Sequence, residues 1–159
     1  MIKMYIENVK TAKGNWVDFP VDIEEMMENF EVENLGQLNV MDYEANFTLK
    51  NYKNIEDVNE LAEILDDMDN LEKQIAENLI EDGIIVDWED LIDAVQDVVV
   101  YEGCKDMEDV AIAIMEEDSA FDGVDERLRD YFNFKEYGET LSITGTYFEI
   151  DGAIVEYLG

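Results

Sequence analysis

The chain has 159 residues, of which 47% are hydrophobic and 33% charged, and its 42 Asp and Glu against 10 Lys and Arg give a formal net charge of −32. This apolar content is typical of a folded protein and too high for a disordered acidic tail. The charge argues against direct binding to nucleic acid or to an anionic membrane surface. No apolar run approaches the roughly 18 residues that a membrane-spanning helix needs.

Residues 1–53 are predicted to form a β-rich module with one short helix. Apolar and polar residues alternate after Lys3, which places Met4, Ile6 and Asn8 on one face of a strand. Pro20 ends the next apolar segment, and Asp22 is a suitable N-cap for the helix that follows. The expected elements are strands at 3–9, 16–19 and 38–43, a turn at 14–15, and a helix over 23–30.

Residues 54–97 are predicted to form a central acidic helical module. Its apolar residues recur at the spacing of amphipathic helices, and the short connections between them indicate a small bundle. The expected helices run over about 55–68, capped near Asn54; over 71–82, capped by Asp69 or Asn70 and closed by Gly83; and from Trp88 after Asp87. The residues expected to face inward are Val58, Leu61, Leu65, Met68, Leu71, Ile75, Leu79, Ile80, Trp88, Leu91, Ile92 and Val95.

Residues 98–159 are predicted to form an α+β module, so the whole chain is assigned to the α+β class. Asp151-Gly152 is a hairpin signal, and Gly145 marks another turn. The expected elements are a strand at 98–101, a helix from Asp106 with Val110, Ala111, Ile114 and Met115 inward, a helix over 125–132, and strand-like sequence over 141–158.

The negative charge is concentrated in the middle of the chain. Residues 56–126 hold 26 acids against Lys73 and Lys105, which is a net charge of −24. Glu56, Glu60, Glu63 and Asp67 form a row on the helix face opposite the apolar one. Ordinary surface helices mix both signs, because opposite charges at i,i+4 stabilise a helix by roughly 0.2–0.5 kcal/mol and like charges cost a similar amount. The missing lysines therefore call for a functional explanation.

Residue types exclude most enzymes. The chain has no histidine, which rules out Ser-His-Asp and Cys-His catalysis and His-containing zinc sites. It also lacks a phosphate-binding glycine motif. Cys104 is the only cysteine and cannot form an intrachain disulfide, which fits a reducing cytoplasm, and residues 1–7 have no signal-peptide character. Catalysis by carboxylates alone and calcium binding are not excluded by this inventory, and each is weighed separately.

Three functions could use so many carboxylates. Residues 66–77 begin with Asp and end with Glu like a calcium loop, but Met68 and Leu71 occupy positions that need a ligand and a glycine. A catalytic carboxylate pair has no specific signal among 42 acids. Imitation of nucleic acid remains: duplex DNA carries about one charge per 1.7 Å, so −32 corresponds to roughly 50 Å of duplex. Halophilic adaptation would not concentrate the charge in one segment.

The candidate DNA-mimicking carboxylates share a place on the polar faces or at the ends of the predicted helices. They are Glu56, Glu60, Glu63, Asp66, Asp67, Glu72, Glu77, Glu81, Asp82, Asp87, Asp90, Asp93, Asp97, Glu108, Asp109, Glu116 and Glu117.

Local motifs along the chain, read together, resemble the ArdA antirestriction family. The matching segments are 4–8, Gly14 with 16–21, 41–44, 52–61, 106–111, Leu128, Tyr131, Tyr137-Gly138, Leu141-Ser142 and Gly145-Thr146-Tyr147. The resemblance implies an elongated α+β protein of three small modules, usually a homodimer, encoded by a mobile element or phage. It further implies a non-enzymatic DNA mimic that needs no cofactor and occupies the DNA site of type I restriction–modification enzymes.

The C-terminal part of this motif is interpreted as structural. Tyr137, Gly138, Leu141, Gly145 and Tyr147 are expected to determine the fold or the dimer. The nearby bases are read as internal or dimer-interface counter-charges, namely Arg127, Arg129 and Lys135. The leading hypothesis is a cytoplasmic DNA-mimic inhibitor of a type I restriction–modification enzyme in a bacterial host. The alternatives are a mimic that inhibits another target, such as a CRISPR effector, and an acidic calcium-binding or scaffold protein.

Overall fold

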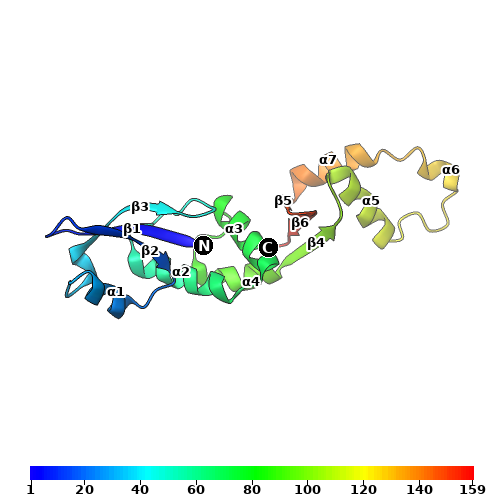
Figure 1. Cartoon of the computed structure of the whole chain (residues 1–159). Coiled ribbons are helices and arrows are strands. Elements are labelled where there is room, and N and C mark those ends of the chain that lie inside the picture. The colour runs from blue at the N-terminus through cyan, green and yellow to red at the C-terminus, as the bar shows by residue number, and fades with distance from the viewer. The chain divides into compact units, whose positions relative to one another are not determined.

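The computed structural model describes all of residues 1–159, and the chain divides into two compact units, Met1–Ile92 and Asp93–Gly159 (Figure 1). Seven α-helices and two three-stranded antiparallel sheets confirm the α+β class. The finer division into three modules stays a prediction.

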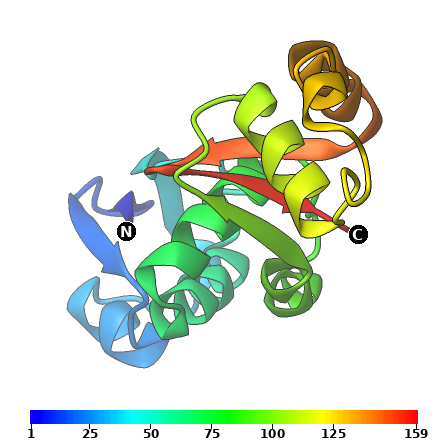
Figure 2. The ribbon, with the colours of Figure 1, turned by 90° about the vertical axis from the view of Figure 1, so that its right-hand side faces the viewer.

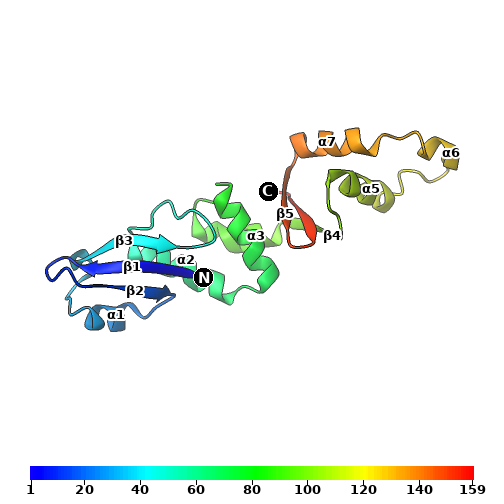
Figure 3. The same ribbon diagram turned by 45° about the horizontal axis from the view of Figure 1, so that its top comes forward.

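The first unit is built on a sheet in which β1 (Ile2–Asn8) lies between β2 (Gly14–Phe19) and β3 (Leu38–Glu44), as Figure 3 shows. The predicted alternation is confirmed: Ile2, Met4, Ile6 and Asn8 are buried, and the residues between them are not. Helix α2 (Ile55–Asp67) contacts β2, and its Val58, Leu61 and Leu65 are buried. The other face carries Lys3, Tyr5, Glu7, Trp16, Asp18 and Asp42, none of which is buried, and is called here the open face.

The predicted turn at Gly14-Asn15 is wrong, because both residues belong to β2 and pair with β1. The turn comes earlier, where the buried Asn8 side chain accepts hydrogen bonds from the amides of Lys10 and Thr11 at 2.9 and 3.3 Å. Gly14 is instead a close-approach residue: a Cβ there would lie 2.7 Å from Cζ of Tyr5. Gly14 was thus interpreted as a turn residue, whereas its small size leaves room for the Tyr5 ring to pack across the sheet.

Local capping signals placed the first three α-helices correctly. They are α1 (Ile23–Asn29), α2 and α3 (Asn70–Glu81), and their caps Asp22, Asn54 and Asp69 each accept backbone N–H bonds. Asp69 and Glu72 form a reciprocal capping box. The prediction for Leu71 was wrong, since it is 42% exposed in the first turn of α3.

The third predicted central helix is only partly correct. The chain forms two short pieces there, the 3₁₀ helix η2 (Trp88–Asp90) and α4 (Leu91–Gln96), and the Asp87 side chain makes no capping bond. Leu91 and Val95 are buried as expected, whereas the prediction for Ile92 was wrong, since it is 51% exposed. A 3₁₀ turn has three residues per turn, so the apolar residues do not keep the register of a single α-helix. A second 3₁₀ helix, η1 (Leu35–Gln37), leads into β3.

A buried amide fastens α2 to the segment before α1. Oδ1 of Asn59 accepts the backbone N–H of Val21 at 2.8 Å, and its Nδ2 donates to Glu63 at 2.8 Å. Glu63 therefore orients the Asn59 amide in addition to carrying charge on the polar side of α2.

The second unit contains a sheet in which β6 (Ala153–Tyr157) lies between β4 (Val98–Glu102) and β5 (Thr146–Ile150), as Figure 2 shows. The predicted Asp151-Gly152 hairpin is confirmed, with Gly152 at φ 80°. Helix α5 (Met107–Glu117), capped by Asp106, buries Val110 and Ala111. The other two residues predicted to face inward, Ile114 and Met115, are only half-buried.

Two helices between α5 and β5 differ from the prediction. Helix α6 is a single turn (Glu126–Arg129) rather than a helix over 125–132. Helix α7 (Phe134–Thr144) was missed, and the strand-like reading of 141–144 was wrong. The β-branched residues at the end of α7 favour a strand only weakly. The cap from Asn133 to the N–H of Glu136, together with packing of α7 against α5, overrides that preference.

Candidate functional site

The acidic side chains remain at the surface throughout the chain. Of the 17 carboxylates proposed from the sequence, 14 are exposed, and Glu72, Glu77 and Asp109 are half-exposed. No Asp or Glu anywhere is buried; the only buried polar residues are Asn8 and Asn59. The helices therefore hold their acids at the protein surface, in contact with water.

The C-terminal ends of the helices show that the charge there is not arranged for stability. A helix C-terminus carries about half a negative charge, so cations there stabilise the helix by about 0.3–1 kcal/mol and anions oppose it. None of α1, α2, α3, α5 or α7 has a basic residue in its last turn. Acids occupy the ends of α2, α3 and α5 instead, namely Asp66 and Asp67, Glu81 and Asp82, and Glu116 and Glu117.

Ion pairing does little to neutralise these helices. The ion pairs are Lys3–Asp18 at 3.2 Å, Arg127–Asp125 at 2.8 Å and Arg129–Glu116 at 2.6 Å. None of them involves an acid of α2, α3 or α4. Even Lys73, which lies within α3, reaches the backbone carbonyl of Asp66 rather than a carboxylate.

Six of the 17 carboxylates have internal partners that sequence reasoning did not foresee. Glu63 accepts a hydrogen bond from the Asn59 amide, and Glu72 accepts one from the N–H of Asp69. Asp109 accepts the N–H of Lys105 at 2.9 Å, and Glu116 accepts a hydrogen bond from the Arg129 guanidinium. Glu77 accepts hydrogen bonds from Asn46, and Glu81 accepts them from Thr48; both donors lie in the loop after β3. The partners of Glu77 and Glu81 are 31 and 33 residues away, so no local signal could have identified them.

The other eleven carboxylates make no side-chain hydrogen bond or ion pair and are called here the free acids. They are Glu56, Glu60, Asp66, Asp67, Asp82, Asp87, Asp90, Asp93, Asp97, Glu108 and Glu117.

The segment 66–77 does not form a calcium loop. Asp66 and Asp67 end α2, Asp69 and Glu72 form the capping box of α3, and Glu77 holds Asn46. No group of three or more Asp, Glu, His or Cys side chains is placed to hold a metal ion.

The C-terminal motif has clear roles in packing. A Cβ on Gly138 would lie within 2.6 Å of the backbone carbonyl carbon of Met107 and still nearer to its oxygen, so the glycine allows α7 to approach α5. A Cβ on Gly145 would lie 2.6 Å from Cε2 of Tyr147. Tyr137 packs edge-on against Phe132 at 6.0 Å between ring centroids, and Leu141 is half-buried on α7.

A second feature missed from the sequence is a clamp across the three strands of the second sheet. Glu156 on the central strand accepts hydrogen bonds from the hydroxyls of Tyr101 on β4 at 2.8 Å and Tyr147 on β5 at 2.7 Å. Burial, and then the hydrogen bond to Glu156, raise the pKa of both phenols well above the usual value of about 10. The folded unit therefore prefers both phenols protonated.

This clamp predicts a loss of stability at alkaline pH. Because the pKa values are higher in the folded than in the unfolded chain, the stabilisation is present below about pH 10 and is lost as the pH rises further. Tyrosinate absorbance should show two of the eight tyrosines titrating last, and the Tyr101→Phe/Tyr147→Phe variant should lose that late phase. Tyr131→Phe, which changes a ring that is 86% exposed, is the control and should leave the late phase intact. A late phase that survives in the double variant would contradict the clamp.

The bases and aromatic rings near α6 form one cluster. The Arg129 guanidinium binds Glu116 and lies 5.4 Å from the ring centre of Phe121. Phe121 in turn packs against Phe132 and Phe134. The bidentate hydrogen bond from Arg127 lowers the pKa of Asp125. Arg129 is thus a counter-charge within the unit, as the sequence interpretation allowed. Arg127 is 87% exposed and pairs only with Asp125, and Lys135 forms no ion pair, so the interpretation is not confirmed for these two bases. Cys104 is half-buried, and burial followed by the nearby carboxylates raises the pKa of its thiol.

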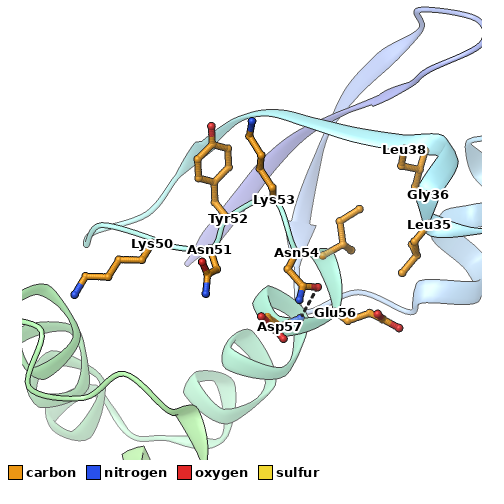
Figure 4. Close-up of a pocket in the computed structure, with 11 residues that line it drawn as sticks. Leu35, Gly36, Leu38, Lys50, Asn51, Tyr52, Lys53, Asn54, Glu56 and Asp57 are labelled. Atoms are coloured by element: carbon orange, nitrogen blue, oxygen red, sulfur yellow. Dashed lines mark hydrogen bonds between the residues drawn. The ribbon is translucent and has the colours of Figure 1, made fainter.

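A cavity of about 750 Å³ in the first unit lies between η1 and the start of α2 (Figure 4). Lys50, Lys53, Glu56 and Asp57 line it, so its charges balance. Lys50 extends toward the end of α3, where its Nζ would be 3.0 Å from a Cβ on Gly83. The cavity gathers no catalytic set of residues.

No helix in the structure has the length and apolar character needed to cross a membrane.

The family model described as antirestriction protein (ArdA) matches residues 8–156. No curated protein sequence matches the chain significantly. The matched range includes all 17 candidate carboxylates and the whole C-terminal motif.

Proposed function

The chain belongs to the ArdA antirestriction family, and we propose that it inhibits type I restriction–modification enzymes by occupying their DNA-binding site as a mimic of DNA. Members of the family are inhibitors of restriction rather than enzymes. The target, the mimicry and the absence of catalysis in this chain are parts of the proposal.

One observation carries the mimicry: the eleven free acids are exposed and unpaired, and acids rather than lysines lie at the C-terminal ends of α2, α3 and α5. A protein that needed only a solvated surface would place lysines there. Along α2, Glu56 and Glu60 are separated by about 6 Å of helix rise, the same order as the spacing of phosphates on one strand. A basic groove that binds DNA would meet a comparable row of negative charges.

The proposal includes a homodimer that acts in the cytoplasm of a bacterial host and derives from a mobile element or phage. Exposed apolar side chains in the second unit support self-association, since such surfaces mark interaction sites. They are Val124, Leu128, Tyr131, Phe132 and Ile143. Sedimentation of the full chain tests this part, because a mass of 18.4 kDa at all concentrations would contradict it.

Inhibition of a purified type I enzyme tests the proposed function directly. DNA cleavage and methylation are measured while the full chain is titrated against competitor duplex DNA, at several salt concentrations. We expect competitive inhibition that weakens steeply with salt, because the mimic and DNA would make similar charge contacts with the enzyme. Inhibition that does not change with salt, or that added DNA does not relieve, would contradict mimicry. If several type I enzymes are not inhibited but another DNA-binding defence complex is, that complex replaces the type I enzyme as the proposed target.

A further inference from the structure

The open face of the first sheet carries two aromatic rings among carboxylates. Antiparallel register places Trp16, Tyr5 and Asp42 in one row across β2, β1 and β3. The rings of Tyr5 and Trp16 meet edge to face with centroids 5.6 Å apart, and Trp16 is 41% exposed. Because side chains directly opposite one another in a sheet share a face, all three project to the same side.

Carboxylates surround these rings on the same face. Glu7 lies two residues from Tyr5 along β1, Asp18 lies two residues from Trp16 along β2, and Asp42 lies across from Tyr5. Asp18 is paired with Lys3. One oxygen of Asp42 accepts the N–H of Tyr43 at 2.9 Å, which leaves its other oxygen without a partner, and Glu7 makes no side-chain bond.

Aromatic faces beside unpaired carboxylates have the chemistry that recognises a guanidinium group. Arginine stacks on Trp and Tyr rings through cation–π attraction, and its planar guanidinium donates hydrogen bonds to carboxylates. Nucleic acid is a poor ligand for this face, since the carboxylates beside the rings would repel its phosphates. A second copy of this chain is also a poor fit, because its net charge is −32 and it has only two arginines.

We propose that the open face of the N-terminal sheet binds an arginine side chain of the protein target, with the guanidinium on the Tyr5–Trp16 pair and its N–H groups directed to Glu7 and Asp42. This inference rests on the proposed function, because a DNA-binding groove is rich in arginine. It adds a localised, stacking contact to the diffuse attraction of the free acids. The stacking part should persist at salt concentrations that screen charges more than a few ångströms apart.

The site can be tested without the target enzyme. The full chain, labelled with ¹⁵N, is titrated at ~0.3 M NaCl with the peptide acetyl-Gly-Arg-Gly-Arg-Gly-amide, because salt at this level suppresses distant attraction. We expect saturable shifts of the Trp16 indole N–H and of amides around Tyr5 and Asp42, with the Trp88 indole unmoved. The same peptide with citrulline in place of arginine should cause no such shifts, because citrulline keeps the planar shape and loses the charge.

Two variants separate recognition from folding. Trp16→Leu keeps an apolar side chain opposite Tyr5 but removes the larger ring, and Asp42→Asn keeps an oxygen for the Tyr43 N–H but removes the charge. Each should weaken peptide binding at least threefold while the spectrum of the remaining chain stays that of the folded protein. Glu60→Gln, which removes the same charge from a free acid on α2, is the matched control and should leave binding unchanged.

Several outcomes would overturn the site. The first is that the peptide shifts only amides of α2, α3 and α4. The second is that Glu60→Gln and Asp42→Asn bind the peptide equally well. The third is that the open-face amides shift with protein concentration alone, which would assign the face to a second copy of the chain. The enzyme assay then tests the link to function: Trp16→Leu should raise the inhibitor concentration needed at high salt. If no restriction enzyme is inhibited by the native chain, the proposed function fails while the peptide titration still decides the site.

Discussion

Replacing Gly138 with alanine is expected to destabilise the C-terminal unit by about 1–3 kcal/mol, the range in which overpacking of a well-packed core falls. Gly138 is buried in α7, and the added methyl group would collide with the backbone carbonyl of Met107 in α5. Backbone cannot rotate away as a side chain can, so the two helices would have to separate. Helix propensity alone predicts the opposite sign, because alanine stabilises a helix by about 1 kcal/mol relative to glycine.

Urea denaturation followed by circular dichroism measures this effect. Both tryptophans, Trp16 and Trp88, lie in the first unit, so their fluorescence provides an internal reference that should change little. Glu139→Ala on the exposed side of α7 is the control and should be close to neutral. An equal or greater stability of Gly138→Ala would show that α5 and α7 do not approach as closely as described.

Neutralising a block of free acids should reduce inhibition strongly without unfolding the chain. We choose Glu56→Gln, Glu60→Gln, Asp66→Asn and Asp67→Asn, all on α2 and none with a side-chain partner. If each acid replaces one phosphate contact, the slope of log affinity against log salt should become shallower by roughly 3–4, and affinity should fall at least tenfold at low salt. Stability should stay the same or rise, because like charges are removed from one helix.

The matched control changes four acids outside the central helices. Glu24→Gln, Glu25→Gln, Glu28→Gln and Glu33→Gln remove the same charge from exposed positions of the first unit. Mimicry predicts a clearly smaller loss from this block. Equal losses from both blocks would mean that only net charge matters, and total loss from a single α2 substitution would indicate a specific catalytic or binding residue instead.

Much of the fold could be predicted from local sequence. The caps Asp22, Asn54, Asp69 and Asp106 are recognisable because each accepts an N–H only two or three residues away. The alternation in β1 and the apolar spacing in α2 are equally local, since they repeat every two residues or every turn. Exposure of the acids follows from the same periodicity, which is why none of them was found buried.

The errors arose where a local signal competes with distant packing. Gly14 was read as a turn because glycine is common in turns, although its hydrogen atom makes room for the Tyr5 ring. The end of α7 was read as a strand because of its β-branched residues, although α7 is held against α5 by an approach that only Gly138 permits. In both places a contact across the structure outweighed intrinsic preference.

The candidate site divides in the same way. The sequence by itself determined that the chain is acidic, that its central acids lie on helices opposite apolar faces, and that few bases are present to pair with them. Only the tertiary structure decided which acids are free and which are used internally, as with Glu77 and Glu81. It also decided that Glu156 joins three strands and that Trp16, Tyr5 and Asp42 share one row. Charge and periodicity are properties of neighbouring residues, whereas each of these pairings depends on how strands and loops distant in sequence are brought together.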